Sequence, residues 1–312
     1  MHKSNSGKLV IVSVFFVAAI LIIAYQFLVN NDSPINIDSP AHFGTPINQD
    51  DITVQGASLG RQLFNDVLLS RHQQISCASC HQQTASYADL GKRFSIGDRG
   101  LPTTRNAPVL INLIWKSHYF ADGRADQLEE TIYNAIRDTL ELNSNIDLIL
   151  ERVRQHPIYS KKLKTIFQVK EIEKEHVIDV LTQYLRTLNS WDSRYDRMLR
   201  GDLVFTAEEK QGQMLFESEC ASCHIAPFFH SNTTMVSLLN QKLQSPSLRN
   251  IHASAPYMHD GRFDGLDSLL LQHPEEFPQT FRKRALNQQE RKSIITFLKT
   301  LSDEQFLNPN SY

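Results

Sequence analysis

The sequence predicts a mainly α-helical protein with two related domains in tandem, preceded by an N-terminal transmembrane helix. Three observations favour this fold class: an apolar N-terminal run, an internal repeat, and apolar residues spaced as on helix faces. The 312 residues, 41% of them hydrophobic, are enough for two modest cores. The formal net charge of −2 gives no electrostatic reason to expect a nucleic-acid partner.

The membrane prediction comes from residues 1–30. Lys3 and Lys8 precede Leu9–Val29, an apolar run of 21 residues, and about 20 helical residues cross a bilayer core. Lysines on the N-terminal side favour an N-in orientation with the rest of the chain exported, and we predict an uncleaved signal anchor that holds a periplasmic protein to the inner membrane. A cleaved signal, which would leave the periplasmic protein soluble, is the alternative, although no small-x-small cleavage site follows the run. Residues 31–51, with three prolines and several Asn and Asp, are predicted to be a linker.

All four cysteines fall in two identical CASCH segments, Cys77–His81 and Cys220–His224. Paired cysteines in an exported chain usually form disulfides, and two CxxC pairs also suit a zinc site or a redox dithiol. Zinc ribbons place the second pair about 15–20 residues after the first, whereas 139 residues separate Cys80 from Cys220. A redox dithiol explains neither the second copy nor the histidine that follows each pair.

Covalent attachment of haem c uses all of these residues, because two thiols bind the porphyrin and the adjacent histidine binds the iron. We therefore predict two covalently bound haem c groups in two c-type cytochrome domains. The residues involved are Cys77, Cys80 and His81 in the first copy, and Cys220, Cys223 and His224 in the second.

An internal duplication surrounds the two motifs. The matching segments are GRQLF (Gly60–Phe64) with GQMLF (Gly212–Phe216), Arg105-Asn106 with Arg249-Asn250, and YFADGRADQLEE (Tyr119–Glu130) with YMHDGRFDGLDS (Tyr257–Ser268). We place the division near Gly201, which gives an N-terminal haem domain over 52–200 and a C-terminal one over 201–312.

Local signals predict helices around the haems. Thr206 and Glu209 form a capping box that opens a helix into the second CxxCH motif. Ile172–Leu188 places its apolar residues on one helix face, and Asn287 with Glu290 begins a final helix. No convincing run of alternating strand residues is present.

The repeat also exposes a difference between the two halves. His273 is the seventh residue after Leu266, whereas the matching residue after Leu128 is Ala135. If this position faces iron, the second haem has two imidazole ligands and the first has an open distal side. If the helix that starts near Leu128 crosses the distal face of the first haem, Glu141, six residues beyond Ala135, lies over that haem, where a carboxylate suits peroxide chemistry as base and then acid. The plainer alternatives are a solvated glutamate and a loop histidine.

Several segments together resemble the bacterial dihaem cytochrome c peroxidase and MauG family, over nearly all of Gly60–Leu301. They are GRQLF, SCASCH, SIGDRG, TRNAP, FADGRA, GQMLF, CASCH, PSLRN and PYMHDGRF. The resemblance implies that the N-terminal haem reacts with peroxide and that the C-terminal haem receives electrons. It implies Glu141, 17 residues after Arg124, as the acid/base, and His273 in the slot where peroxidases have Met and MauG enzymes have Tyr.

The family resemblance also implies one Ca2+ between the haems. Its ligands would be the Asn106 side chain and the carbonyls of Ser254 and Pro256, a set of hard oxygen donors. The alternative is that Asn106 only caps a turn. Relatives are often homodimers, so a homodimer is a further implied partnership.

The chain departs from the family at positions near the first haem. Ser95–Asp98 lacks the displaceable histidine of many peroxidases, so we expect activity without prior reduction. Three further differences are Ala121 for Trp, Thr131 for Gln and Leu142 for Met. Losing that tryptophan leaves the inter-haem electron route open; Trp115 and Tyr119 are candidate substitutes or simply core residues.

The leading functional prediction is a dihaem cytochrome c peroxidase. It would reduce hydrogen peroxide to water with electrons from a small cytochrome c or another exported donor. The alternatives are a MauG-like enzyme that oxidises a side chain of a partner protein, and a non-catalytic dihaem electron carrier or redox sensor.

Overall fold

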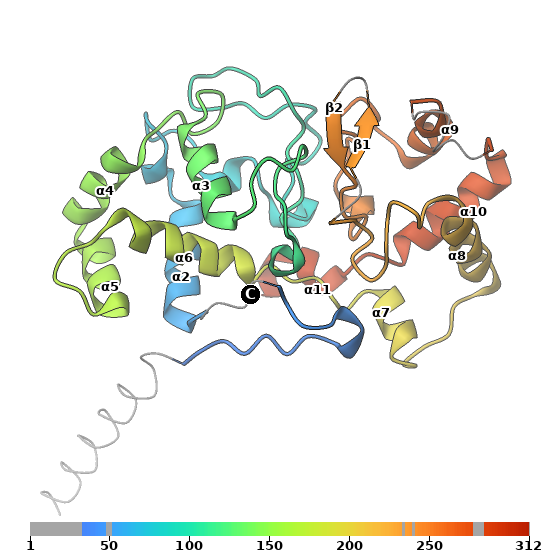
Figure 1. Cartoon of the computed structure of the whole chain (residues 1–312), viewed down its shortest axis with the longest axis horizontal. Coiled ribbons are helices and arrows are strands. Elements are labelled where there is room, and N and C mark those ends of the chain that lie inside the picture. Colours follow the sequence, from blue (N-terminus) through green and yellow to red (C-terminus); the bar gives the residue numbers. More distant parts are fainter. Residues whose placement is uncertain (1–32, 48–51, 233–234, 239–240, 277–283, 312) are drawn as a thin grey trace, which may run out of the picture.

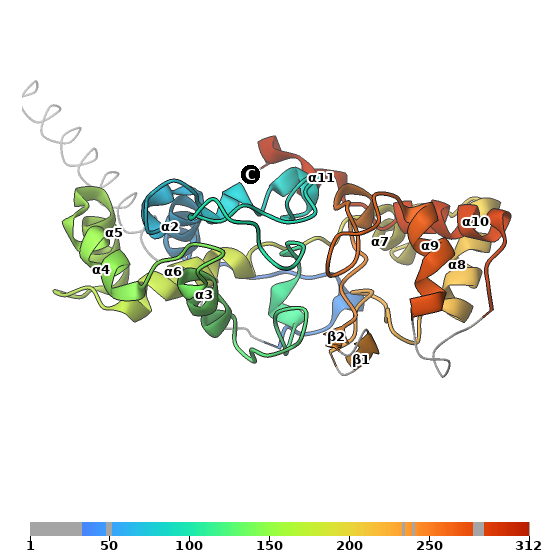
Figure 2. The same cartoon turned by 90° about the horizontal axis from the view of Figure 1, so that it is seen from above.

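The structure is a computed structural model that describes residues 33–47, 52–232, 235–238, 241–276 and 284–311. The predicted transmembrane helix over 1–30 lies outside the described residues. Within those ranges, no helix is long and apolar enough to cross a membrane. The chain is mainly helical, as predicted, and its two halves lie side by side along the long axis (Figures 1 and 2).

The first half of the chain builds a five-helix group. Its helices are α2 (Val54–Asn65), α3 (Leu128–Arg137), α4 (Ile146–Gln155), α5 (Pro157–Phe167) and α6 (Lys174–Arg186). Helix α2 packs along α6, and a hydrophobic core forms around this pair. The helix predicted from the apolar face of Ile172–Leu188 is confirmed as α6.

The second half has its own core around a second helix pair. Its elements are α7 (Arg194–Leu199), α8 (Ala207–Glu219), strands β1 (Met235–Leu238) and β2 (Gln241–Gln244), α9 (Leu266–Glu276), α10 (Gln288–Lys299) and α11 (Glu304–Leu307). Short 3-10 helices complete the fold: η1 (Ala41–Phe43), η2 (Val67–Leu69), η3 (Cys77–Ser79), η4 (Gln83–Ala85), η5 (Leu113–Trp115), η6 (Ile251–Ala253) and η7 (Pro309–Ser311). The capping boxes predicted at Thr206 and Asn287 are confirmed at the starts of α8 and α10.

The repeated GxxLF segments have a packing reason for their glycines. A Cβ atom on Gly60 would lie 1.8 Å from the carbonyl oxygen of Val180 in α6. A Cβ atom on Gly212 would lie 2.0 Å from the carbonyl oxygen of Ser293 in α10. Each glycine therefore lets two helices touch backbone to backbone, and the two halves use the same device.

The structure corrects one part of the predicted repeat. Asn250 corresponds to Asn112, not to Asn106, because both residues have left-handed backbones (φ 57° and 52°) and both begin a 3-10 helix. In each half a tyrosine hydroxyl then donates to the first carbonyl of that 3-10 helix. The contacts, both 3.1 Å, are Tyr119 to Leu113 and Tyr257 to Ile251. The Arg-Asn dipeptide of Arg105-Asn106 was too short a match to fix the alignment.

The β1–β2 hairpin was not predicted. Its strands are only four residues long, with Met235 opposite Gln244, and so they are too short to give a clear alternating pattern. The hairpin projects at the boundary between the halves (Figure 1). The backbone N–H of Gln244 donates to the carbonyl of Ala121 at 2.8 Å, which ties the hairpin to the first half.

Residues 33–47, predicted to be part of a linker, pack instead as an N-terminal strap along both halves (Figure 1). Phe43 is 4% exposed and packs against Trp115 of the first half and Phe228 of the second. The Nε2 atom of His42 lies 2.9 Å from a carboxylate oxygen of Asp196. The strap therefore joins the two halves through apolar and polar contacts.

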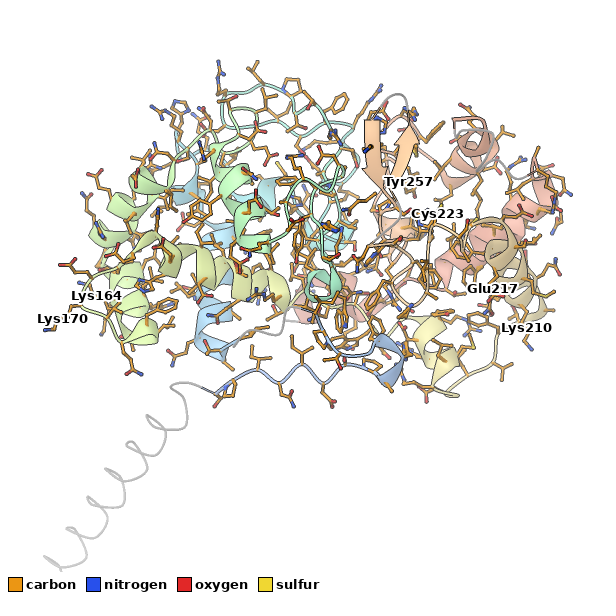
Figure 3. The ribbon with its side chains drawn as sticks, viewed as in Figure 1. Lys164, Lys170, Lys210, Glu217, Cys223 and Tyr257 are labelled. Carbon is orange, nitrogen blue, oxygen red and sulfur yellow. The ribbon has the colours of Figure 1, made fainter. Side chains whose placement is uncertain are left out.

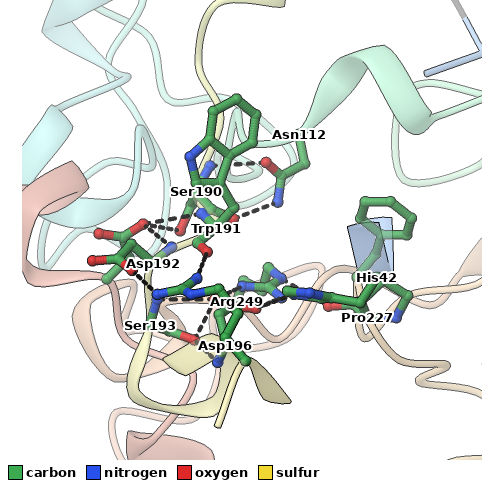
Figure 4. Close-up of polar contacts among 12 residues, drawn as sticks. His42, Asn112, Ser190, Trp191, Asp192, Ser193, Asp196, Pro227 and Arg249 are labelled. Atoms are coloured by element: carbon green, nitrogen blue, oxygen red, sulfur yellow. Dashed lines mark hydrogen bonds and ion pairs between the residues drawn. The ribbon is translucent and has the colours of Figure 1, made fainter. Parts of the chain in front are cut away.

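Asp196 also forms a fully buried ion pair with Arg249, drawn in Figure 4. The two guanidinium nitrogens donate to the two carboxylate oxygens at 2.7 and 2.8 Å. Burial alone would raise the pKa of Asp196, but hydrogen bonds and charge from Arg249 lower it to about 2. Removing one partner of such a pair leaves an unpaired buried charge, so losing either Asp196 or Arg249 should strongly destabilise the second half.

Candidate active site

The first CxxCH motif lies at the end of a short loop after α2. Its first three residues form η3, and Cys77 packs against the core of the first half. His81 Nδ1 donates to the Tyr87 carbonyl at 2.6 Å, which leaves Nε2 available as a metal ligand. Burial lowers the pKa of His81, and a neutral imidazole is the form that binds iron.

The second motif repeats this arrangement. His224 Nδ1 lies 3.0 Å from the Phe229 carbonyl and 3.1 Å from the Pro246 carbonyl. Burial also lowers the pKa of His224. Cys223 lies in the second half of the molecule, below the β1–β2 hairpin (Figure 3). Both motifs therefore present an oriented, neutral imidazole beside two thiols.

The residues present fit two haem c groups better than the other interpretations of the cysteines. All four cysteines are free in the structure. Within the described ranges, no group of three or more His, Cys, Asp or Glu residues could hold a metal ion such as zinc. Burial raises the pKa of Cys77 to about 12, so this thiol is protonated and unlike an activated redox cysteine.

Glu141 lies in the turn that follows α3, not on the helix itself. Its backbone N–H donates to the Asp138 carbonyl at 3.1 Å, and its carbonyl accepts the Asp98 N–H at 2.9 Å. Burial raises the pKa of Glu141 to about 7; the charge of Asp138 raises it further, and that of Arg124 opposes the rise. The carboxyl group therefore exchanges a proton near neutral pH.

A cleft of about 330 Å3 gives access to this carboxyl group. Its lining residues are Phe120, Arg124, Asn134, Arg137, Asp138 and Glu141. The Arg124 guanidinium lies 3.5 Å from the centre of the Phe120 ring and donates to Asp122 at 2.9 Å. A carboxyl group that titrates near pH 7 beside such a cleft can take up and return protons of a small substrate.

The Ser95–Asp98 loop fixes the position of the Glu141 turn. A Cβ atom on Gly97 would lie 2.0 Å from the carbonyl oxygen of Leu140, so loop and turn touch directly. Asp98 is buried and accepts the His72 backbone N–H at 3.1 Å, with His72 Nδ1 at 2.6 Å from its other oxygen. Burial opposes the charge of Asp98, but the hydrogen bonds from His72 and Ser70 lower its pKa overall.

His273 lies on α9, but its side chain is outside the described part of the structure. Ala135, at the matching place in the first half, lies on α3 and is partly buried. The backbone thus places both residues on corresponding helices. Ligation by His273 and an open first haem remain predictions.

The calcium residues meet around one short segment. The Asn106 amide nitrogen donates to the carbonyls of Lys92 and Arg93 at 3.0 and 3.2 Å. The Gly91 N–H, one residue earlier, donates to the Ala255 carbonyl at 3.2 Å, between Ser254 and Pro256. The three predicted ligands therefore flank the same segment, and calcium binding remains a prediction.

Trp115 and Tyr119, the two aromatic candidates for the inter-haem electron route, are both core residues. Trp115 is 2% exposed and Tyr119 is 3% exposed. The Tyr119 hydroxyl is bound to backbone carbonyls of Leu113 and Lys116. Sequence reasoning missed Arg124, Arg137 and Asp138 as neighbours of Glu141, because it did not predict the turn after α3 in which Glu141 lies.

The fold and the two motifs define a class, namely c-type cytochromes with two haem-binding halves. A model described as di-haem cytochrome c peroxidase matches residues 54–203, and one described as a cytochrome c-550 domain matches residues 190–305. The chain is 30% identical over 282 residues to the methylamine utilization protein MauG of Methylorubrum extorquens (strain AM1), covering 81% of this chain and 80% of the relative. It is 29% identical over 273 residues to the cytochrome c551 peroxidase of Nitrosomonas europaea, covering 80% of each.

A solved structure agrees with these relatives. A MauG-like protein associated with microbial copper homeostasis has a TM-score of 0.80 at 26% identity, covering 89% of this chain and 99% of that one. The chain belongs to the di-haem cytochrome c peroxidase and MauG family. It is therefore an oxidoreductase of the cytochrome c peroxidase type, with two c-type haems.

Proposed function

We propose that this protein is a periplasmic dihaem peroxidase that reduces hydrogen peroxide to water. The observation that carries the proposal is Glu141, a carboxyl group with a pKa of about 7 beside an accessible cleft in the same half as the first CxxCH motif. The named peroxidases among the relatives support it. The predicted signal anchor would hold the protein to the inner membrane.

In this mechanism Glu141 takes a proton from one oxygen of hydrogen peroxide and returns it to the other oxygen, which leaves as water. Two electrons and two further protons complete the conversion to two waters. When bound, the haems supply the iron at which the O–O bond breaks and the path for electrons from an exported donor such as a small cytochrome c. The Asp98 backbone N–H keeps the Glu141 turn in place during this proton transfer.

The direct test is steady-state oxidation of reduced cytochrome c by hydrogen peroxide, with the anchor removed and both haems loaded. Replacing Glu141→Gln should lower the turnover rate by about 10²- to 10⁴-fold, because the general acid/base is lost. Glu130→Gln, on the exposed surface of α3, is the matched control and should leave the rate unchanged. Equal rates for Glu141→Gln and wild type would remove Glu141 from the mechanism.

We also propose that His81 and His224 are proximal ligands and that His273 completes the second haem, leaving the first with an open site. Electron paramagnetic resonance of the oxidised protein should then show one high-spin and one low-spin haem. His273→Gly should convert the low-spin signal of the second haem into a high-spin signal, because the sixth ligand is lost. Two low-spin signals at rest would contradict the open site and the expected activity without prior reduction.

A second candidate function is MauG-like oxidation of a partner protein. It is favoured by the 30% identity to a MauG protein and by the similarity to the MauG-like structure. In that case peroxide should oxidise a side chain of a protein from the same periplasm, detected by mass spectrometry, while cytochrome c is turned over poorly. The third alternative, a non-catalytic electron carrier or redox sensor, is less well supported because the family consists of oxidoreductases.

A further inference from the structure

His230 is a buried imidazole whose ring nitrogens make no well-formed hydrogen bond in the described structure, although the Ser231 backbone acts on the ring. The residue is 5% exposed, and neither ring nitrogen meets a partner in hydrogen-bonding geometry within the described structure. Its ring stacks on Phe228 with a centroid distance of 5.4 Å. Leaving a buried polar group unsatisfied is unfavourable, so this imidazole is suited to hydrogen-bond a bound group. His230 lies six residues after His224, in the loop of the second CxxCH motif.

The first half of the chain contributes a cation, Lys116, whose charge acts on this imidazole. The Asn232 side chain accepts the Ser117 N–H at 3.3 Å and donates to the Trp115 carbonyl at 2.9 Å. It therefore hydrogen-bonds to the backbone on both sides of Lys116. Burial lowers the pKa of Lys116 to about 8. Burial, and then the charge of Lys116, lower the pKa of His230 to about 3. This junction of the two halves therefore supplies a poorly solvated ammonium and a neutral imidazole, and both can donate a hydrogen bond.

We propose that Lys116 and His230 bind a carboxylate group, and that this carboxylate is a propionate of the haem attached at Cys220 and Cys223. An ammonium and an imidazole N–H are suitable partners for a carboxylate that leaves water. The haem is the local source, because the same loop holds its thioethers and its axial histidine. The inference requires only the c-type haem of the family, and it stands whether or not the protein reduces peroxide.

Binding of this kind sets the reduction potential of the second haem. A propionate charge that is balanced by Lys116 repels the electron less, whereas an unbalanced charge favours the ferric state. Lys116→Met should therefore lower the potential of the second haem, by a shift of the ferric/ferrous equilibrium of about tenfold, or about 59 mV for a one-electron couple. His230→Phe, which keeps the aromatic stack and removes both nitrogens, should shift it in the same direction, and His230→Gln should restore part of it.

The experiment is a spectroelectrochemical titration of the holoprotein, with the two haems resolved. Lys210→Met is the matched control, because it removes the same charge from the exposed surface of α8 at the outer end of the second half (Figure 3). Resonance Raman spectra of the propionate bending modes give a readout that does not depend on activity, and they should change in Lys116→Met but not in Lys210→Met. If Lys116→Met fails to retain haem, His230→Phe and His230→Gln carry the same comparison.

Two results would overturn the assignment. In the first, Lys116→Met and His230→Phe have the potential and Raman spectrum of the Lys210→Met control. In the second, the wild-type potential moves when inorganic phosphate is added at constant ionic strength. That would show an exchangeable anion at this junction rather than a resident propionate.

Discussion

Among single residues, Asp138 adds its negative charge to the effect of burial on the pKa of Glu141. Its Oδ1 atom accepts the Leu140 N–H at 2.8 Å, which an asparagine oxygen can also do. Asp138→Asn therefore keeps the turn but removes the negative charge that helps to raise the Glu141 pKa. Because the carboxylate form of Glu141 must accept a proton, the rate of reaction with peroxide should rise with pH through about 7 in the wild type.

In Asp138→Asn the midpoint of this profile should fall by roughly 0.5–1 pH unit, since removal of a nearby like charge favours the carboxylate. At pH 6 the variant should then react about three- to fivefold faster than the wild type. Stopped-flow mixing with hydrogen peroxide measures both profiles, with Glu130→Gln as the control on the same helix. An unchanged midpoint would show that Asp138 does not influence the reacting carboxyl group.

At the scale of helices, the two glycine contacts explain how α2 packs closely on α6 and α8 on α10. Gly60→Ala or Gly212→Ala would force a methyl group against a carbonyl oxygen of α6 or α10. Since the obstacle is backbone, the helix pair must separate, and overpacking of this kind costs about 1–3 kcal/mol. Guanidinium unfolding followed by far-ultraviolet circular dichroism should show the loss for each variant.

Gly265→Ala is the control for this experiment, because its new methyl group would meet nothing closer than Ser268 Oγ at 3.8 Å. It should unfold at the same denaturant concentration as the wild type. If Gly60→Ala behaves like Gly265→Ala, the α2–α6 contact is looser than the structure indicates.

The helices were predictable where short-range chemistry decides them. The capping pairs at Thr206 and Asn287 satisfy N–H groups within one turn, and the repeat of GxxLF reports a contact that both halves need. The candidate site was predictable only in part. Glu141 was found from its distance along the chain from Ala135 and Arg124. The electrostatic effect of Arg124 on Glu141 and that of Lys116 on His230 were not predicted, because each links residues far apart in sequence. No local pattern encodes such pairs, because tertiary packing creates them.

At the scale of the whole molecule, each terminal segment contacts the half that is farther away in the sequence. The strap over 33–47 places Phe43 beside Phe228 of the second half, while α11 near the C-terminus places Phe306 against Tyr87 of the first. Figures 1 and 2 both show α11 lying near the centre of the molecule. This exchange couples the haem halves mechanically, and we expect them to unfold together.

Phe43 gives the sharpest test of that coupling. Its ring packs against Trp115, Trp191 and Phe228 with centroid distances of 5.4, 6.4 and 5.1 Å, so Phe43→Ala opens a cavity at the junction of the halves. A buried Phe→Ala change costs about 3–5 kcal/mol, and here the loss falls on contacts that join the halves. Calorimetry of the holoprotein should therefore resolve two transitions in place of one. Ile47→Ala, in the same strap but with a side chain 57% exposed, should keep a single transition. A single unshifted transition in Phe43→Ala would mean that the strap rests on the surface without joining the two halves.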